Sequence, residues 1–513
     1  MPLHYPTLRQ RINAAKRSLP HSPIIQAENH GVSPTNFLID PSVAKAVLSH
    51  HELVAIDSDS DSSSNASAEC NHMNTVDEMK KENSPPCNAN LKKPTKPTKL
   101  LHHALTNSNG ATWTRQRYCV SRAFSVDKTL RASCATYAVE KTMEIIYEAN
   151  RLTSTTAGFG CTPFSCMSRT ARRKTRGQLV TRIRRRTIGV DVRNLAREVA
   201  ILTMSRMVLG SRRGSNGIVL DSLREMVDDT LEPRRDEKYS KETMMKVERL
   251  DVVVREIIDE ISNDLDGDSG QDGDCLARRL LSHEKIAKTD KYLTRDEVVG
   301  NSHSALLAGV QTICTTIAGA LLHLAENPQM QHDLKEGNIS GKDIVKETLR
   351  ILPPVAGLPR IPTECDVELE DPTIRSNTKS SASVRKCPIP KDQLMVVDLL
   401  AFAHAQPFEN DHETTIGSMS NALPTLKFDP TQKIKSQAQP WGIGKRKCPA
   451  GIISVECISS VIESLAKGGV TWTFIDRKDC VGLENSEGWM KSVSYRPTLS
   501  YASPIFINFM ANQ

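Results

Sequence analysis

The residues best suited to chemistry lie in one glycine-rich segment near the C-terminus, Trp441-Gly-Ile-Gly-Lys-Arg-Lys-Cys-Pro-Ala-Gly451. Cys448 follows Lys447 directly and stands two residues after Arg446. Neighbouring cations lower the pKa of a thiol, and the thiolate is the form that acts as a nucleophile or metal ligand. The glycines allow backbone angles that other residues avoid, so the loop can fold around a flat object. The segment therefore predicts a catalytic thiolate or a single-cysteine metal ligand at Cys448.

Two pairs of side chains earlier in the chain have the spacing of neighbours on a helix. Glu347 and Arg350 are three residues apart, and Trp113 and Arg117 are four apart. Taken alone, the first pair suits a solvated surface ion pair of little energetic value. The second suits an aromatic anchor of an amphipathic helix. Arginine also matches a carboxylate with its planar fork, so both pairs are candidates for binding or structural roles.

A third feature is the apolar run from Ser304 to Ala325, which has helical periodicity and follows Asn301. Within it, Ala308-Gly-Val-Gln-Thr312 places a glycine, an amide and a hydroxyl close together. Glycine inside a helix costs about 1 kcal/mol relative to alanine and often marks a close approach to the backbone. The run predicts either a buried core helix with a packing glycine or a helix that faces a bound group.

Together, and in the order in which they follow one another along the chain, these four segments resemble the cytochrome P-450 superfamily. The cysteine segment is similar to its haem-binding loop, aromatic-x-x-Gly-x-Arg-x-Cys-x-Gly, with Trp441, Gly444, Arg446 and Cys448 in the four slots. The usual phenylalanine is replaced by tryptophan, and Ala450 stands where the last glycine is usual. The resemblance implies that haem b is the cofactor and that Cys448 is the iron ligand.

The resemblance also assigns roles to the other segments. Glu347 and Arg350 correspond to a buried pair that locks the haem-binding core. Thr312 would hold the oxygen ligand or a proton-relaying water, with Gln311 in place of the commoner acid, and Gly309 would lie against the cofactor. The residues expected at the haem propionates are Trp113, Arg117, Arg360 and Arg446. Residues such as Ala305, Ala308 and Val310 would line a dry substrate face.

Two segments depart from the family pattern. His404-Ala-Gln-Pro407 and Phe428-Asp-Pro-Thr431 stand where the family has His-Arg-Asp-Pro and a meander, and both lack arginine. In the family, the meander arginine completes a triad with the pair that Glu347 and Arg350 match. The sequence offers no clear replacement for it.

The elements that must position these residues are mostly helical. Helical patterns cover 127–152, 189–209, 240–264 and 274–284. Residues 33–50 are interpreted as a strand, a turn at Asp40-Pro41 and a helix. Further strands are expected at 367–369, 394–399 and within 470–511. The resemblance implies a mainly α fold with a minor β portion. It would form one large α+β domain over 33–511, with haem between the central helix and the cysteine loop. Polar insertions are expected at 57–99, 169–186 and 374–386.

Composition excludes several other classes of protein. The 513 residues include 13 scattered cysteines, an odd number, which argues against a disulfide framework and a zinc cluster. The net charge of +7 is mild for this length and does not demand nucleic acid. The basic stretch 169–186 is interpreted as a solvated loop, with a docking surface for an acidic electron-transfer partner and a nuclear or nucleic-acid element as alternatives.

The N-terminal residues 1–32 are expected to be a basic arm or a transit segment, because residues 1–27 contain four basic side chains and no acid. No run of about 20 apolar residues suggests a spanning helix there. An intracellular protein is expected, with mitochondrial import as one alternative.

The function implied by the resemblance is monooxygenation, in which O2 is activated reductively and one oxygen atom enters a small apolar substrate. The chain has no flavin or nicotinamide fingerprint, so electrons would come from a separate reductase or ferredoxin. Two alternatives stay open. One is a haem-thiolate isomerase, dehydratase or peroxygenase that needs no electron donor, and the other is a degenerate, non-catalytic haem binder.

Overall fold

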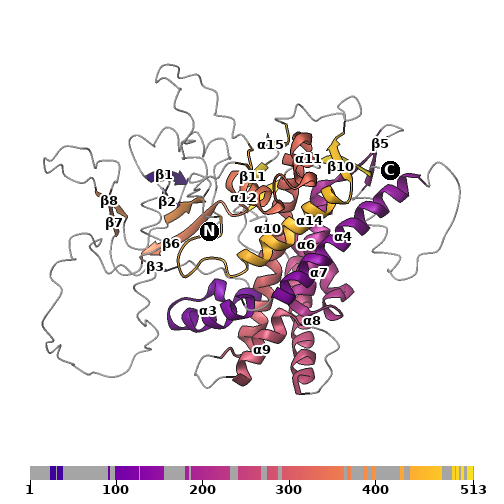
Figure 1. Ribbon diagram of the computed structural model, residues 1–513. Coiled ribbons are helices and arrows are strands. Elements are labelled where there is room, and N and C mark those ends of the chain that lie inside the picture. Colours follow the sequence, from indigo (N-terminus) through magenta and orange to yellow (C-terminus); the bar gives the residue numbers. More distant parts are fainter. Residues whose placement is uncertain are drawn as a thin grey trace, which may run out of the picture.

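The structure is a computed structural model (Figure 1). It describes residues 24–29, 32–38, 91–92, 99–125, 128–154, 180–183, 187–231, 241–266, 274–286, 292–362, 367–370, 386–389, 395–399, 428–431, 440–475, 488–491, 493–495, 498–501 and 505–511. The helix expected after residue 40, the segment 404–407 and most of the three polar insertions lie outside the described residues.

Helices dominate the described chain, as expected for a mainly α fold. They are α3 (Gly110–Ser125), α4 (Lys128–Ser154), α6 (Val192–Leu209), α7 (Gly217–Leu231), α8 (Lys241–Asp266), α9 (Leu276–Ile286), α10 (Arg295–Glu326), α11 (Pro328–Glu336), α12 (Gly341–Ile351), α14 (Gly451–Lys467) and the short α15 (Gly488–Lys491). Single 3-10 turns occur at η1 (Lys99–Leu101), η2 (Leu105–Asn107) and η4 (Arg213–Ser215). The helices expected at 127–152, 240–264 and 274–284 are confirmed as α4, α8 and α9.

The minor β portion consists of small sheets. A five-stranded sheet has the order β1-β2-β9-β6-β3, from β1 (Ile24–Asn29), β2 (Val32–Leu38), β9 (Met395–Asp398), β6 (Gly357–Pro362) and β3 (Leu91–Lys92). A four-stranded sheet has the order β10-β13-β5-β4, from β10 (Val470–Phe474), β13 (Phe506–Ala511), β5 (Thr187–Asp191) and β4 (Val180–Ile183). Two hairpins pair β7 (Val367–Glu370) with β8 (Lys386–Ile389) and β11 (Val493–Tyr495) with β12 (Leu499–Tyr501).

Three boundaries differ from the sequence prediction. The helix expected from residue 189 begins at Val192, because residues 187–191 form β5 and the Asp191 carboxylate accepts the N–H of Arg193 as an N-cap. Part of the basic stretch interpreted as a solvated loop is strand β4, which pairs with β5. Part of the expected N-terminal arm is strand β1, which pairs with β2.

The long helix α10 runs through the middle of the helical layer (Figure 1). It begins well before Ser304, because Thr294 and Glu297 form a reciprocal capping box that starts a helix at Arg295. Among the described residues it is the one helix long and apolar enough to cross a bilayer, yet two thirds of its most apolar window is buried in the protein. Its partners are α6, α12 and α14, so it is a core helix.

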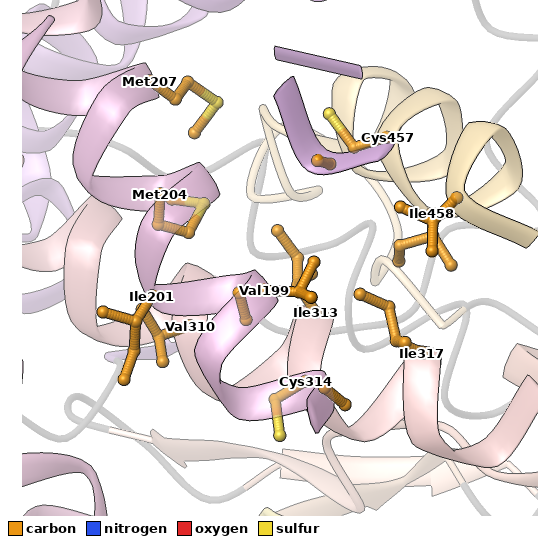
Figure 2. Packing of buried hydrophobic residues seen from close by; sticks show 14 of the residues in the cluster. Val199, Ile201, Met204, Met207, Val310, Ile313, Cys314, Ile317, Cys457 and Ile458 are labelled. Carbon is orange, nitrogen blue, oxygen red and sulfur yellow. The ribbon is translucent and has the colours of Figure 1, made fainter. Parts of the chain in front are cut away.

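The core packs α10 against α6 and α14 (Figure 2). Val310, Ile313 and Ile317 of α10 face α6 and α14. A Cβ at Gly309 would lie 2.2 Å from the Met204 methyl carbon, so the missing side chain makes room for Met204. Burying one such aliphatic side chain is worth about 1.5–3 kcal/mol, and this seam therefore fixes where α10 lies. Other α6 and α14 residues in the seam are Val199, Ile201, Met207, Cys457 and Ile458.

Candidate cofactor site

The loop that carries Cys448 is a closed turn placed before α14. The Cys448 N–H donates to the Trp441 carbonyl at 2.8 Å, and the Lys447 N–H donates to the Gly444 carbonyl at 3.0 Å. Gly442 and Gly444 have φ of 74° and 73°, in the left-handed region that favours glycine. The tight glycine-dependent loop expected from the sequence is therefore present, and the half-buried Cys448 lies three residues before Gly451, the first residue of α14.

The structure explains why this loop departs from the family pattern at 450 and 451. Ala450 has φ −91°, which any residue adopts, so the position does not require glycine. A Cβ at Gly451 would lie 3.3 Å from the indole of Trp441. The glycine that stands one position late therefore makes room for the larger aromatic ring.

The expectation that the pKa of Cys448 is lowered overall is wrong for the free thiol. Burial raises the pKa of this thiol, and it outweighs the Ala450 backbone N–H and the charges of Arg117 and Lys447, which lower it. Coordination to a metal ion deprotonates a thiol outright. Of the two roles that the sequence left open, the surroundings favour a metal ligand over an activated nucleophile. Among the described residues, no group of three His, Cys, Asp or Glu side chains could hold a metal ion, so Cys448 would be a single protein ligand.

Three arginines from separate elements lie around this loop: Arg117 of α3, Arg360 of β6 and Arg446 of the loop itself. The Arg446 guanidinium lies 4.3 Å from the centre of the Trp113 ring and donates to Asn109 Oδ1 at 3.1 Å. Burial, followed by the charges of Arg360 and Arg117, lowers the pKa of Arg446 to about 9. The sequence prediction that these four side chains share one place is consistent with this geometry.

Arg360 is the least satisfied of the three. Its side chain is 4% exposed, its Nε has no hydrogen-bond partner, and its Nη1 donates to the adjacent Pro359 carbonyl at 2.7 Å. Burial lowers its pKa to about 10. Burying a charge without a counter-ion is unfavourable, and this site therefore suits an anionic group.

One face of α10 is open, although most of the helix is buried. Ala308 is exposed, and Ala305, Gly309 and Thr312 are partly exposed on the same side of the helix. The Thr312 hydroxyl donates to the Ala308 carbonyl at 2.9 Å, which leaves its oxygen as an acceptor on that side. Small side chains at this spacing make a flat, mostly apolar surface.

Two residues expected on this face lie elsewhere. Val310 is fully buried beside α6 and does not line the open side (Figure 2). Gln311 is buried, and its amide nitrogen donates to the Leu499 carbonyl at 3.0 Å. In this structure the Gln311 amide nitrogen therefore makes a structural hydrogen bond directed away from the open face. The close neighbour of Gly309 in the structure is Met204, a packing contact that sequence spacing could not reveal.

The Glu347–Arg350 pair is buried, as the family resemblance implied. Arg350 donates from Nε and Nη2 to the two Glu347 carboxylate oxygens at 2.7 and 2.6 Å, and both side chains are less than 10% exposed. The Asp429 N–H donates to Glu347 Oε1 at 3.0 Å. Residues 428–431 therefore reach this pair through the main chain.

Sequence reasoning missed two contributors next to this pair. One is the Asp429 backbone amide, which no side-chain pattern can announce. The other is His323 of α10, whose ring stacks on Phe428 at 4.3 Å between ring centres. A lone histidine in an apolar helix carries no signal that would separate it from an ordinary core residue.

Comparison with known proteins shows what this chain is similar to. Residues 203–338 match the family model described as Cytochrome P450. Two solved structures match nearly the whole chain. P450 OxyD, which is involved in the biosynthesis of vancomycin-type antibiotics, has a TM-score of 0.58 and 14% identity over 98% of this chain and 97% of its own. The cytochrome P450 CYP102L1 has a TM-score of 0.59 and 13% identity over 98% of both chains. The expected fold is confirmed.

Curated relatives match over shorter segments. The mitochondrial sterol 26-hydroxylase of Mus musculus is 29% identical over 147 residues, which are 24% of this chain and 27% of that protein. Cytochrome P450 109 of Bacillus spizizenii is 33% identical over 79 residues, 15% of this chain and 19% of that protein. Cytochrome P450 monooxygenase claQ of Ampulloclitocybe clavipes is 24% identical over 155 residues, 26% and 29% of the two chains. The matched segments thus span less than a third of each relative.

Proposed function

Because the chain belongs to the cytochrome P450 family, we propose that it is a haem-thiolate monooxygenase that inserts one oxygen atom of O2 into a small apolar organic substrate. The observation that carries this proposal is the buried Arg360, which has an unpartnered Nε and lies close to Arg446 of the Cys448 loop. A site of this kind suits the carboxylates of a bound group.

The residues present fit haem b. Neither Arg117 nor Arg360 has a carboxylate partner among the described residues, and propionates would supply one to each. Trp113 holds the Arg446 guanidinium in place by its ring face. Cys448 offers one sulfur next to these cations, and the small side chains of α10 offer a flat surface for a planar macrocycle.

When bound, thiolate-ligated haem supplies the iron chemistry that activates O2. The residues of this chain would do the rest. Cys448 would hold the iron through its sulfur and donate electron density to it. The hydroxyl of Thr312 would accept a hydrogen bond from a proton-carrying water, with its own proton held by the Ala308 carbonyl. Ala305 and Ala308 would keep that side of the site free of competing polar groups.

A separate reductase or ferredoxin would supply the electrons. The substrate class is proposed as apolar, and the sterol 26-hydroxylase relatives make sterols the first compounds to test in substrate-binding difference spectra.

Carbon monoxide spectroscopy tests the proposed ligand. The reduced protein with bound carbon monoxide should show the red-shifted Soret band of a thiolate-ligated haem, and Cys448→Ala should abolish it. Cys457→Ala, a change to another buried cysteine of the adjoining helix, should leave the band in place. A wild-type protein that binds haem without this band would refute the proposal.

One observation favours a second candidate function. Residue 311 is a glutamine, and its amide nitrogen donates to the Leu499 carbonyl. Thr312 therefore has no acid directly before it on α10. A peroxygenase or isomerase on the same scaffold needs no such acid. Turnover with hydrogen peroxide or a substrate hydroperoxide, in the absence of any electron donor, would favour that candidate.

A further inference from the structure

His323 lies in the last turn of α10 and is enclosed by aromatic rings. Its side chain is 4% exposed, and neither ring nitrogen has a hydrogen-bond partner. The ring is stacked on Phe428 at 4.3 Å with an interplanar angle of 10°. The Trp489 ring meets it edge-on at 5.0 Å. A buried imidazole with two unsatisfied nitrogens is unfavourable, so its retention calls for an explanation.

Phe428 belongs to the short segment 428–431 that contacts the Glu347–Arg350 pair. The segment is shaped by Asp429, whose Oδ1 accepts the N–H and the hydroxyl of Thr431. Its main-chain amide at Asp429 holds Glu347. In the family that the chain resembles, an arginine side chain from this region completes the contact, and here 428–431 contains none. Phe428, the residue before Asp429 in this segment, stacks on His323.

We propose that His323 is a positioning residue: its neutral ring, stacked on Phe428, anchors residues 428–431 to the Glu347–Arg350 pair, and protonation of the ring releases that segment. The proposal concerns the protein alone and does not depend on the cofactor.

The charged groups around the ring explain why protonation is unfavourable. Arg350 of α12 lies close enough that its charge, after the larger effect of burial, helps lower the pKa of His323 to about 3. Glu347 accepts hydrogen bonds from Arg350 and Asp429. Asp429 accepts from Thr431, and Glu326 of α10 faces Trp489. None of these carboxylates makes a hydrogen bond to the ring.

The direction of the pH effect follows from these contacts. The pKa of His323 is depressed in the closed state and ordinary, about 6.5, once the segment opens. The contact of residues 428–431 with the Glu347–Arg350 pair is therefore fully stable above about pH 6.5. It weakens progressively as the pH falls toward about 3, the pKa of His323 in the closed state. Between about pH 7.5 and 5.5, the opening constant should rise about tenfold.

Hydrogen–deuterium exchange of peptides covering 428–431, in the full-length protein, tests the proposal. Wild type and His323→Phe are compared at the same pH, so that the intrinsic exchange chemistry cancels. Phenylalanine keeps the stack and takes no proton. The ratio of wild-type to variant exchange should rise about tenfold from about pH 7.5 to 5.5. His332→Phe, at an exposed position of α11, should keep the wild-type behaviour.

Two further variants keep the proposal testable if His323→Phe fails to fold. His323→Met fills the site with a flexible apolar side chain and should remove the same pH dependence. Phe428→Leu should increase exchange of 428–431 at both pH values, because the stack is lost. The proposal would be overturned if the ratio of wild-type exchange to variant exchange stayed constant with pH for both His323→Phe and His323→Met. Unchanged exchange of residues 428–431 in Phe428→Leu would also overturn it.

Discussion

At the scale of single residues, Trp441 and Gly451 are matched in size. The ring of Trp441 occupies the space where a side chain at 451 would begin, at 3.3 Å from an ideal Cβ. Gly451→Ala should therefore displace the indole by a few tenths of an ångström and lower stability by about 1 kcal/mol. Thermal unfolding of the cofactor-free protein measures this loss.

The control for this prediction is a smaller ring. Trp441→Phe in the Gly451→Ala background should recover part of the stability, because phenylalanine leaves room for the methyl group. Ala450→Gly should change little, since φ at 450 is ordinary. If Gly451→Ala and the double variant are equally destabilised, the two residues are not coupled.

Two buried arginines of similar exposure should respond to the same substitution in opposite ways. Arg350 is held by the Glu347 carboxylate, whereas Arg360 has an unpartnered Nε and no ion pair among the described residues. Arg350→Met should cost about 3–5 kcal/mol, because it leaves Glu347 buried and uncompensated. Arg360→Met should be neutral or stabilising in the cofactor-free protein and should weaken haem retention. Denaturant unfolding and haem titration measure the two effects. Equal destabilisation by both variants would contradict a role for Arg360 as a site for an anion.

At the scale of elements, α10 has two faces at neighbouring positions. Thr312 lies on the open face, while Gln311 donates inward to the Leu499 carbonyl. Gln311→Glu would place a carboxylate acceptor against that carbonyl and should cost about 1–3 kcal/mol, where sequence reasoning alone would expect faster proton supply. Thr312→Ala, one residue away, should keep the fold and lower product yield per electron. Thermal unfolding measures the stability of both variants. A Gln311→Glu variant as stable as the wild type would contradict this placement of the amide.

The helices were predictable where one face is apolar and the other meets solvent. The helices α4, α8 and α9 fall within a few residues of their expected ranges for that reason. The start of α10 was missed because its first turns are polar and yet buried. There Glu297 pairs with Arg115, and Asn301 bonds to Gln116 and the Leu105 N–H. Such partners lie far away in sequence, so no local pattern reveals them.

For the candidate site, the sequence predicted residue types better than their surroundings. The structure contains the tight loop around Cys448, the buried Glu347–Arg350 pair and the contact of Arg446 with Trp113. The direction of the Cys448 pKa was wrong, because the sequence shows neighbouring charges but not burial. The neighbours of Gly309 and Gln311 were equally invisible, since each is set by a helix or loop that packs there only in the folded chain.

At the scale of the whole molecule, α10 joins regions that are distant in the chain. Its first turns bind α3 through Glu297 and Arg115, and His303 binds Asp251 of α8 at 3.1 Å. Its open face carries Thr312, and its last turn carries the stacked His323. A helix of this length rises about 1.5 Å per residue, so one rigid rod sets the spacing of all these contacts.

The hydrogen bond from the Asp429 amide to Glu347 also determines which substitutions this segment tolerates. Every residue except proline carries a backbone N–H, so substitution of the side chain at 429 leaves the donor in place. This contact to Glu347 therefore places no demand on the side chain at 429, whereas a contact through an arginine side chain would require that one residue type.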